Sequence, residues 1–285
     1  GTPALEQGLK HYDKVQVAAA TGTGKTILCY SIVRNTNKTV LFLCPTISLV
    51  KQSFDEWSNF EQLNAMIVCS DNDAGDDETV VSTNPNKIEA FLLNPMNTRL
   101  NVVFGTYHSA SKIAEAQTSL GNHEFDIVFY DEAHQTVTHK NGRNYQAVLD
   151  SVIKSKKKVF VTATRKVIEV DNGRLNVANM NDELVYGKLV YELTTKEAIE
   201  KGWSCPFVPY MIQVDEQEMT EPISELINNT TISYSSEIMK ARHVASLICI
   251  IKSINELGSK KIATFHQTND SAIAFSKLII ELQKS

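Results

Sequence analysis

The sequence KVQVAAATGTGKT (residues 14–26) sets the organisation of the whole chain. Its first half is an apolar run typical of a strand buried on both faces, and its second half brings two glycines and a lysine before a helical pattern. In such a strand–loop–helix unit, Gly22 and Gly24 let backbone amides surround a phosphate, and the helix dipole adds positive potential. Lys25 reaches the β- and γ-oxygens, while Thr26 offers a hydroxyl to Mg²⁺.

The loop departs from the strict phosphate-loop pattern at one position. Ala19 stands six residues before Lys25, where the strict pattern has glycine, so the looser form of the motif applies. Thr23 lies between the two glycines and belongs to the same cradle. The alternative is a Gly/Thr turn that binds nothing. The sequence Gly-Lys-Thr between a buried strand and a helix favours phosphate binding.

Strands and helices are predicted to alternate through the first half of the chain. Continuous apolar runs predict buried strands at 14–20, 39–45, 65–70, 100–106, 125–131 and 157–163. Helical patterns lie between them at 25–35, 46–60, 86–94, 108–118 and 143–154. This alternation predicts an α/β fold with a parallel sheet and helices on both faces.

The pattern changes after Thr164. Turn residues and short strands precede a capped helix in TTKEAIEKG, with Thr194 or Thr195 as the cap and Gly202 at the end. We then predict a strand at 205–214, a helix at about 235–257, a strand at 261–266 and a final helix running to Ser285. The expected domains are residues 1–204, with an interdomain segment at about 165–204, and residues 205–285, the truncated start of a second domain.

Two adjacent acids end another buried strand in FYDEAH (129–134). In phosphoryl transfer Asp131 can hold the Mg²⁺ shell, while Glu132 can orient and deprotonate the attacking water. His134 is three positions after Asp131, so it is better placed to couple than to ligate. The alternative is an acidic cap at a helix start, which becomes weak once a phosphate loop is present in the same chain.

Weaker signals come from hydroxyl and indole side chains. Thr162 and Thr164 end a third buried strand and could connect the acidic loop to a neighbouring domain, although threonine is common in strands. Trp57 and Trp203 are interpreted as helix and interdomain packing residues, with stacking on nucleic-acid bases as the alternative.

Composition limits the class of protein without selecting one. The net charge is −5, but residues 71–78 carry five acids and no base, so the remainder is neutral and can still present a basic groove. The five cysteines are scattered, which argues against a disulfide framework or a zinc site and suits a reducing compartment. Neither a membrane-spanning run nor a signal peptide is recognisable, so we expect no membrane association and a cytoplasmic, nucleoid or viral-replication location rather than secretion.

The ordered motifs resemble those of superfamily 2 helicases and translocases. ATGTGKT, PTISLVKQ (45–52), GTYHS (105–109), DEAH and TAT occur in the family's order, and KIATFHQTNDSAIAF (261–275) is similar to its motif IV. The segment 180–203 resembles the DNA-directed branch, which includes the motor subunits of type I and III restriction enzymes and related phage or large-virus helicases. The resemblance covers nearly the whole chain and implies two RecA-like domains.

The resemblance also implies roles for matched positions. The phosphate loop and DEAH would bind and hydrolyse ATP with Mg²⁺ held by Thr26 and Asp131, and His134, Thr162 and Thr164 would couple hydrolysis to movement. Backbone contacts with nucleic acid, most readily double-stranded DNA, are implied for five positions: Pro45, Thr46, Gly105, Thr106 and His266. Phosphate contacts of this kind give affinity without reading sequence. Other subunits or fused domains are expected as partners.

Three departures from the family pattern qualify these expectations. The adenine-reading glutamine would fall at or just before Gly1, and Gln7 is too near the loop to be assigned that role. The arginine-finger motifs would lie beyond Ser285, so the chain alone is expected to bind ATP·Mg²⁺ and to turn it over slowly. Arg165 follows TAT where relatives often have proline, which would alter the exit from the strand.

Three alternatives remain open. An RNA helicase also carries DEAH, and only the interdomain resemblance favours DNA. Another phosphate-loop ATPase, such as a DNA-packaging motor, is disfavoured by the TFH stretch at 264–266. A module that binds nucleic acid but has lost turnover is disfavoured by the intact Lys25, Asp131 and Glu132.

Overall fold

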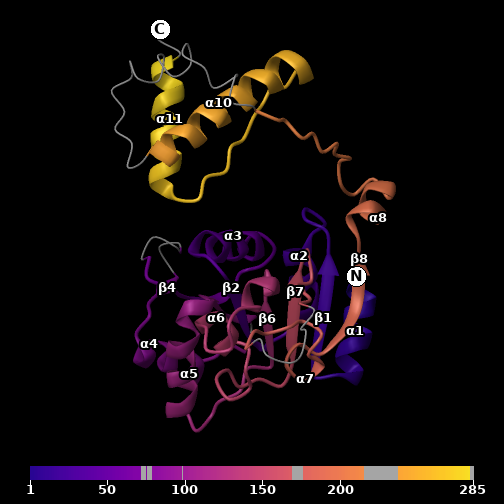
Figure 1. Ribbon diagram of the computed structural model, residues 1–285. Coiled ribbons are helices and arrows are strands. Elements are labelled where there is room, and N and C mark those ends of the chain that lie inside the picture. The colour runs from indigo at the N-terminus through magenta and orange to yellow at the C-terminus, as the bar shows by residue number, and fades with distance from the viewer. Residues whose placement is uncertain (72–74, 76–78, 98, 169–175, 215–236, 283–285) are drawn as a thin grey trace. The chain divides into compact units, whose positions relative to one another are not determined.

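The chain forms two compact units, Gly1–Pro206 and Phe207–Ser285 (Figure 1). The computed structural model describes residues 1–71, 75, 79–97, 99–168, 176–214 and 237–282. The stretch 71–78, the acidic run of the sequence, therefore lies largely outside the described residues.

The first unit is built on one eight-stranded sheet in which every pairing is parallel. The strand order is β4-β3-β5-β2-β6-β7-β1-β8. The strands are β1 (Lys14–Ala19), β2 (Thr39–Cys44), β3 (Asn64–Val68), β4 (Val80–Val81), β5 (Asn101–Thr106), β6 (Ile127–Tyr130), β7 (Lys158–Thr162) and β8 (Lys188–Leu193). The prediction of an α/β fold with a parallel sheet is confirmed.

Helices cover both faces of this sheet, and each group packs against its own buried cluster (Figure 1). One face carries α1 (Thr2–His11), α2 (Lys25–Val33), α3 (Ile47–Ser58) and α8 (Thr195–Glu200). The other carries α4 (Pro85–Leu93), α5 (Ala110–Ser119), α6 (Arg143–Gln146) and α7 (Glu183–Tyr186).

Alternate residues of each central strand serve the two faces. In β2, Phe42 belongs to the cluster under α2 and α3, whereas Leu41 and Leu43 belong to the cluster on the other face. All three are fully buried, which explains why the run is continuously apolar instead of alternating. Trp57 of α3 packs edge-on against Phe42 at 5.2 Å between ring centroids, so its interpretation as a packing residue is confirmed.

The helix predicted at 143–154 is wrong in length, since α6 ends at Gln146. The carbonyl groups that would continue it have other partners. The Tyr130 hydroxyl donates to the Ala147 carbonyl at 3.2 Å, and the Lys158 ammonium donates to the Val148 carbonyl at 2.8 Å. Tertiary hydrogen bonds therefore replace helical ones after the first turn.

Lys158 is a buried cation at the start of β7, with 2% of its side chain exposed. Burial lowers the pKa of Lys158 to about 8, although Asp150, 2.9 Å away, opposes the shift. Removing the carboxylate would leave the ammonium buried without its counter-charge. Because Asp150 is partly exposed, we expect Asp150→Ala to lower the free energy of unfolding by about 2 kcal/mol, less than for a fully buried pair.

Urea denaturation provides the test of this pair. The matched control is Asp13→Ala, which removes the carboxylate from the neighbouring Lys157 at an exposed site and should change stability by less than about 1 kcal/mol. Adding Lys158→Met to Asp150→Ala should restore much of the loss, because the buried charge is then gone. Equal losses from Asp150→Ala and Asp13→Ala would show that the buried lysine does not depend on its partner.

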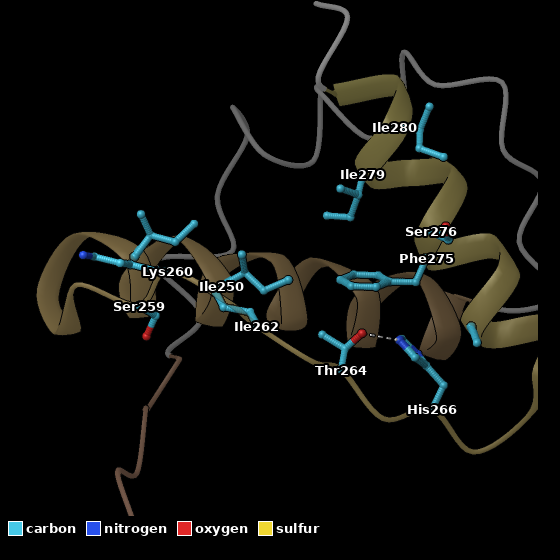
Figure 2. A pocket seen from close by; sticks show the side chains of 12 residues that line it. Ile250, Ser259, Lys260, Ile262, Thr264, His266, Phe275, Ser276, Ile279 and Ile280 are labelled. Atoms are coloured by element: carbon cyan, nitrogen blue, oxygen red, sulfur yellow. Dashed lines mark hydrogen bonds between the residues drawn. The ribbon is translucent and has the colours of Figure 1, made fainter. Parts of the chain in front are cut away.

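The second unit contains α10 (Glu237–Leu257) and α11 (Asn269–Leu282), which hold Val244, Ile248, Phe275 and Leu278 in a small core. The strands predicted at 205–214 and 261–266 are wrong for this structure, since both stretches are irregular. A strand needs a neighbour to pair its backbone groups, and none lies beside them among the described residues. A cavity of about 500 Å³ lies next to these helices, lined by Ile250, Ile262, Phe275 and Ile279 among others (Figure 2).

Of the helices in the described part of the chain, none combines the length and the apolar character needed to cross a membrane.

Candidate active site

The turn between β1 and α2 has the backbone of a phosphate cradle. Gly22 and Gly24 adopt left-handed conformations, with φ of 77° and 81°. A Cβ atom at either position would meet nothing within 4 Å, so glycine is required by backbone conformation and not by lack of space. The Thr23 hydroxyl donates to the Ala20 carbonyl at 2.6 Å and braces the loop. Lys25 begins α2, whose first amides have no partners within the helix.

The sheet order brings three sequence motifs to one edge. β6, β7 and β1 are neighbours and run parallel, so their carboxyl ends lie side by side. Asp131 follows β6, Thr162 ends β7 and the glycine loop follows β1. The predicted nucleotide and coupling residues of this unit therefore share the carboxyl edge of the sheet, the usual place for ligands in open α/β sheets.

Asp131 is a buried acid whose charged form is disfavoured. Its side chain is almost fully buried, and burial together with the charge of Glu132 raises its pKa to about 6. The positive charge of Lys25 acts in the opposite direction and partly offsets this rise in the pKa of Asp131. A buried acid of this kind is stabilised by any cation brought to it.

Glu132 and His134 continue the acidic loop in an unusual backbone conformation. Glu132 is left-handed at φ 49° and ψ 46°, which is costly for a residue with a side chain and tends to persist at functional sites. His134 Nδ1 lies 3.3 Å from Glu132 Oε2 and 3.0 Å from Thr162 Oγ1. The Thr162 hydroxyl in turn donates to the Thr164 carbonyl at 3.0 Å. A continuous polar chain thus runs from Glu132 to Thr164.

The predicted nucleic-acid positions of the first unit differ in how exposed they are. Thr46 is exposed and caps α3 by accepting from the Leu49 amide at 3.3 Å. Pro45 beside it is half-buried. Gly105 and Thr106 are buried, and the Thr106 hydroxyl is paired with Ser109, so neither offers a side chain to a ligand.

At the end of β5 the exposed side chain is that of His108.

His266 belongs to the second unit. Its Nε2 lies 3.1 Å from the Thr264 hydroxyl, and its ring packs against Phe275 with 5.0 Å between centroids (Figure 2). The Ser271 hydroxyl lies 3.1 Å from Nε2 of His243 and 3.4 Å from Nδ1 of His266, so it bridges the two imidazoles. These contacts fix the ring in its loop.

The residues near the loop fit Mg²⁺ better than a transition metal. Among the described residues there is no group of three or more histidine, cysteine or acidic side chains that could enclose a metal ion. Mg²⁺ needs less from the protein, because one or two oxygen ligands suffice when phosphates and water supply the rest. The Asp131 carboxylate and the Thr26 hydroxyl are such oxygen donors, and the raised pKa of Asp131 favours a bound cation.

Two features of this region were not foreseen from the sequence. Arg165 forms hydrogen bonds with Gln16 Oε1, the Met180 carbonyl and Asn181 Oδ1, so it ties the exit of β7 to β1. A cavity of about 340 Å³ adjoins the glycine loop, and Trp203 forms part of its wall. Trp203 is 57% exposed, and its interpretation as an interdomain packing residue stays a prediction.

Comparisons with known proteins find one matching family model and similar solved structures. Residues 3–167, more than half of the chain, match the family described as type III restriction enzyme, res subunit. A nuclease-deletion mutant of the Type ISP restriction-modification enzyme LlaGI, in complex with a DNA substrate mimic, has 30% identity and a TM-score of 0.62 over 71% of this chain and 17% of that chain. The ATP-dependent Type ISP restriction-modification enzyme LlaBIII bound to DNA has 28% identity and a TM-score of 0.58 over 70% and 15%.

This chain thus spans about a sixth of the length of those enzymes. No curated protein matches the sequence.

Proposed function

The chain belongs to the family of type III restriction enzyme res subunits, within the superfamily 2 helicases and translocases, and we propose that it is an ATP-driven motor that moves along double-stranded DNA. The observation that supports ATP-driven chemistry is the meeting of Lys25, Asp131 and Glu132 at one edge of the sheet. Membership of the family supports nucleic acid as the partner.

Phosphate binding follows from the geometry of the loop. The left-handed glycines aim successive amides inward, and the N-terminus of α2 adds a partial positive charge. The Lys25 ammonium then neutralises the β- and γ-phosphate oxygens, where negative charge accumulates during transfer. These groups are in place before the nucleotide arrives, so little reorganisation is needed.

Hydrolysis needs a cation and an oriented water. Thr26 and Asp131 would hold Mg²⁺, which when bound supplies charge neutralisation at the phosphates. Glu132 is adjacent to Asp131 and 26% exposed, so its carboxylate can reach a water at the γ-phosphate and accept the proton. Asp131 is buried and Glu132 is partly exposed, so the first acid suits the cation and the second suits the attacking water.

Coupling is assigned to the polar chain between Glu132 and Thr164. Loss of the γ-phosphate would change what Glu132 contacts, and His134 would pass that change to Thr162 at the end of β7. The Thr162 hydroxyl bonds to both the carbonyl and the amide of Thr164, so a shift at Thr162 moves the backbone that leaves the sheet. This backbone would transmit movement to the rest of the protein.

Thr162→Ala is expected to separate binding from stimulation. The ATP dissociation constant should stay within about twofold, because Thr162 does not line the glycine loop. DNA-stimulated turnover should fall roughly tenfold, the size of a typical coupling loss. Steady-state hydrolysis with and without duplex DNA measures both quantities. Thr118→Ala is the control, because that exposed hydroxyl bonds only within α5. An equal effect on basal and stimulated rates would contradict coupling through Thr162.

The choice of duplex DNA over RNA rests on relatives. Two solved enzymes similar to this chain are described as bound to DNA or to a DNA substrate mimic, and both are restriction-modification enzymes. An RNA helicase is the second candidate, since the site chemistry is the same for both. Stimulation of hydrolysis by RNA alone would select that candidate.

A further inference from the structure

A cavity of about 340 Å³ adjoins the glycine loop and is lined by residues of α1, α2 and β8. Gly24 and Lys25 line the cavity beside the glycine loop, and Ile27 and Leu28 in the first turn of α2 contribute apolar side chains. Trp203 also lines the cavity, as do Thr2 and Tyr191 among others. This cavity therefore combines a charged side chain with apolar ones. A nucleotide has the same combination, because the ribose separates its charged phosphates from its base.

The backbone of Trp203 is fixed by the end of α8. The Trp203 amide donates to the Ala198 carbonyl at 2.8 Å, and the Gly202 amide donates to the Ile199 carbonyl at 2.9 Å. Gly202 is left-handed at φ 71°, so these two hydrogen bonds form the glycine cap that commonly ends a helix. In that cap the residue in the position of Trp203 usually packs back against the helix. Here the indole is 57% exposed instead.

An exposed indole in a rigid position is a suitable surface for stacking. Trp203 loses little conformational freedom on binding because its backbone is already held. The Lys201 ammonium lies 5.1 Å from the centroid of the indole ring, which restrains one side of it and adds positive charge near an anionic ligand.

We propose that Trp203 stacks on the purine base of the nucleoside triphosphate whose phosphates the glycine loop holds. This inference rests on the proposed function, because it assumes that the loop binds a nucleotide. Trp203 lies four residues before Phe207, the first residue of the second unit. The base therefore contacts the segment that joins the two units, so nucleotide binding restrains that segment directly.

Binding of ATP and of inorganic tripolyphosphate, both with Mg²⁺, tests this role by calorimetry on the 285-residue chain. Tripolyphosphate occupies the loop but has no base. Trp203→Ala should weaken ATP binding by about tenfold or more, the range expected for loss of one base–aromatic contact, and leave tripolyphosphate binding within about twofold. Trp203→Phe should keep most of the ATP affinity. It should also lose less of the preference for ATP over CTP than Trp203→Ala does, because purines stack more strongly.

Fluorescence gives an independent readout. The chain has two tryptophans, and Trp57 is fully buried. ATP should quench the emission of the wild-type chain more strongly than that of Trp203→Phe, in which only Trp57 remains, hydrogen-bonded to the Thr26 carbonyl at 3.2 Å. Unchanged ATP affinity in Trp203→Ala, or an equal loss for ATP and tripolyphosphate, would overturn stacking. If the wild-type chain binds neither compound, the proposed nucleotide function fails first, and the stacking inference fails with it.

Discussion

Lys25→Ala is expected to lower ATP turnover by at least about 100-fold, the loss typical when one preorganised charge donor is removed from a reacting centre. Lys25 is the first residue of α2, directly after the glycine loop, and its positive charge lowers the pKa of Asp131. Without its ammonium, negative charge on the β- and γ-phosphate oxygens loses its nearest protein cation. The measurement is steady-state release of phosphate at saturating ATP.

Lys112→Ala is the matched control for this change. Lys112 is an exposed lysine of α5 paired with Glu115, so the variant removes the same charge away from the glycine loop. It should retain wild-type turnover. Retention of turnover in Lys25→Ala would mean that the glycine loop is not the phosphate site.

Asp131→Asn is expected to abolish turnover and to stabilise the fold. The Asp131 carboxyl has a folded pKa of about 6 against an ordinary value of 3.8, because burial and Glu132 disfavour its charge. A raised pKa for an acid means that the folded state binds the proton more tightly, so stability falls as the pH rises from about 4 to about 6. At pH 7.5 the charged form costs up to about 3 kcal/mol, which asparagine avoids.

Thermal unfolding without nucleotide, measured between pH 4 and pH 7.5, tests whether Asp131→Asn raises or lowers the stability of the fold. The variant should be more stable than wild type at pH 7.5, and the difference should shrink as the pH falls toward 4.

Asp126→Asn is the opposing control. Burial works against the charge of Asp126, but hydrogen bonds from Lys156 and from the Thr39 amide outweigh it and hold the pKa of that carboxyl below its ordinary value. Asp126→Asn should therefore destabilise the fold at pH 7.5. If both variants shifted stability in the same direction, the claim that the folded state disfavours the charged form of Asp131 would be wrong.

The sheet was predictable because burial on both faces leaves a direct trace in the sequence. The run TVLFLC is apolar at nearly every position, and β2 lies at Thr39–Cys44 as expected. The caps of α8 were also readable, since Thr194 accepts from the Glu197 amide and Gly202 takes the left-handed turn. Local chemistry decides these features, and the sequence reports local chemistry well.

Features that depend on distant partners were not predictable. The helix after Gly142 stops early because Tyr130 and Lys158, on neighbouring strands, take its carbonyls. The stretch at 261–266 has strand composition, but composition cannot supply a neighbouring strand.

At the candidate site, the glycine loop and DEAH could be named from their motifs. The exposure of Trp203 and the burial of Thr106 depend on how separate elements pack, which no spacing in the sequence records.

The central claim is that ATP hydrolysis at this site serves movement on duplex DNA. The most direct measurement is the ATP hydrolysis rate of the whole protein that carries residues 1–285, compared without nucleic acid and with duplex DNA, single-stranded DNA or RNA. The account predicts strong stimulation by duplex DNA that disappears in Lys25→Ala. Hydrolysis that none of these nucleic acids changes would contradict it.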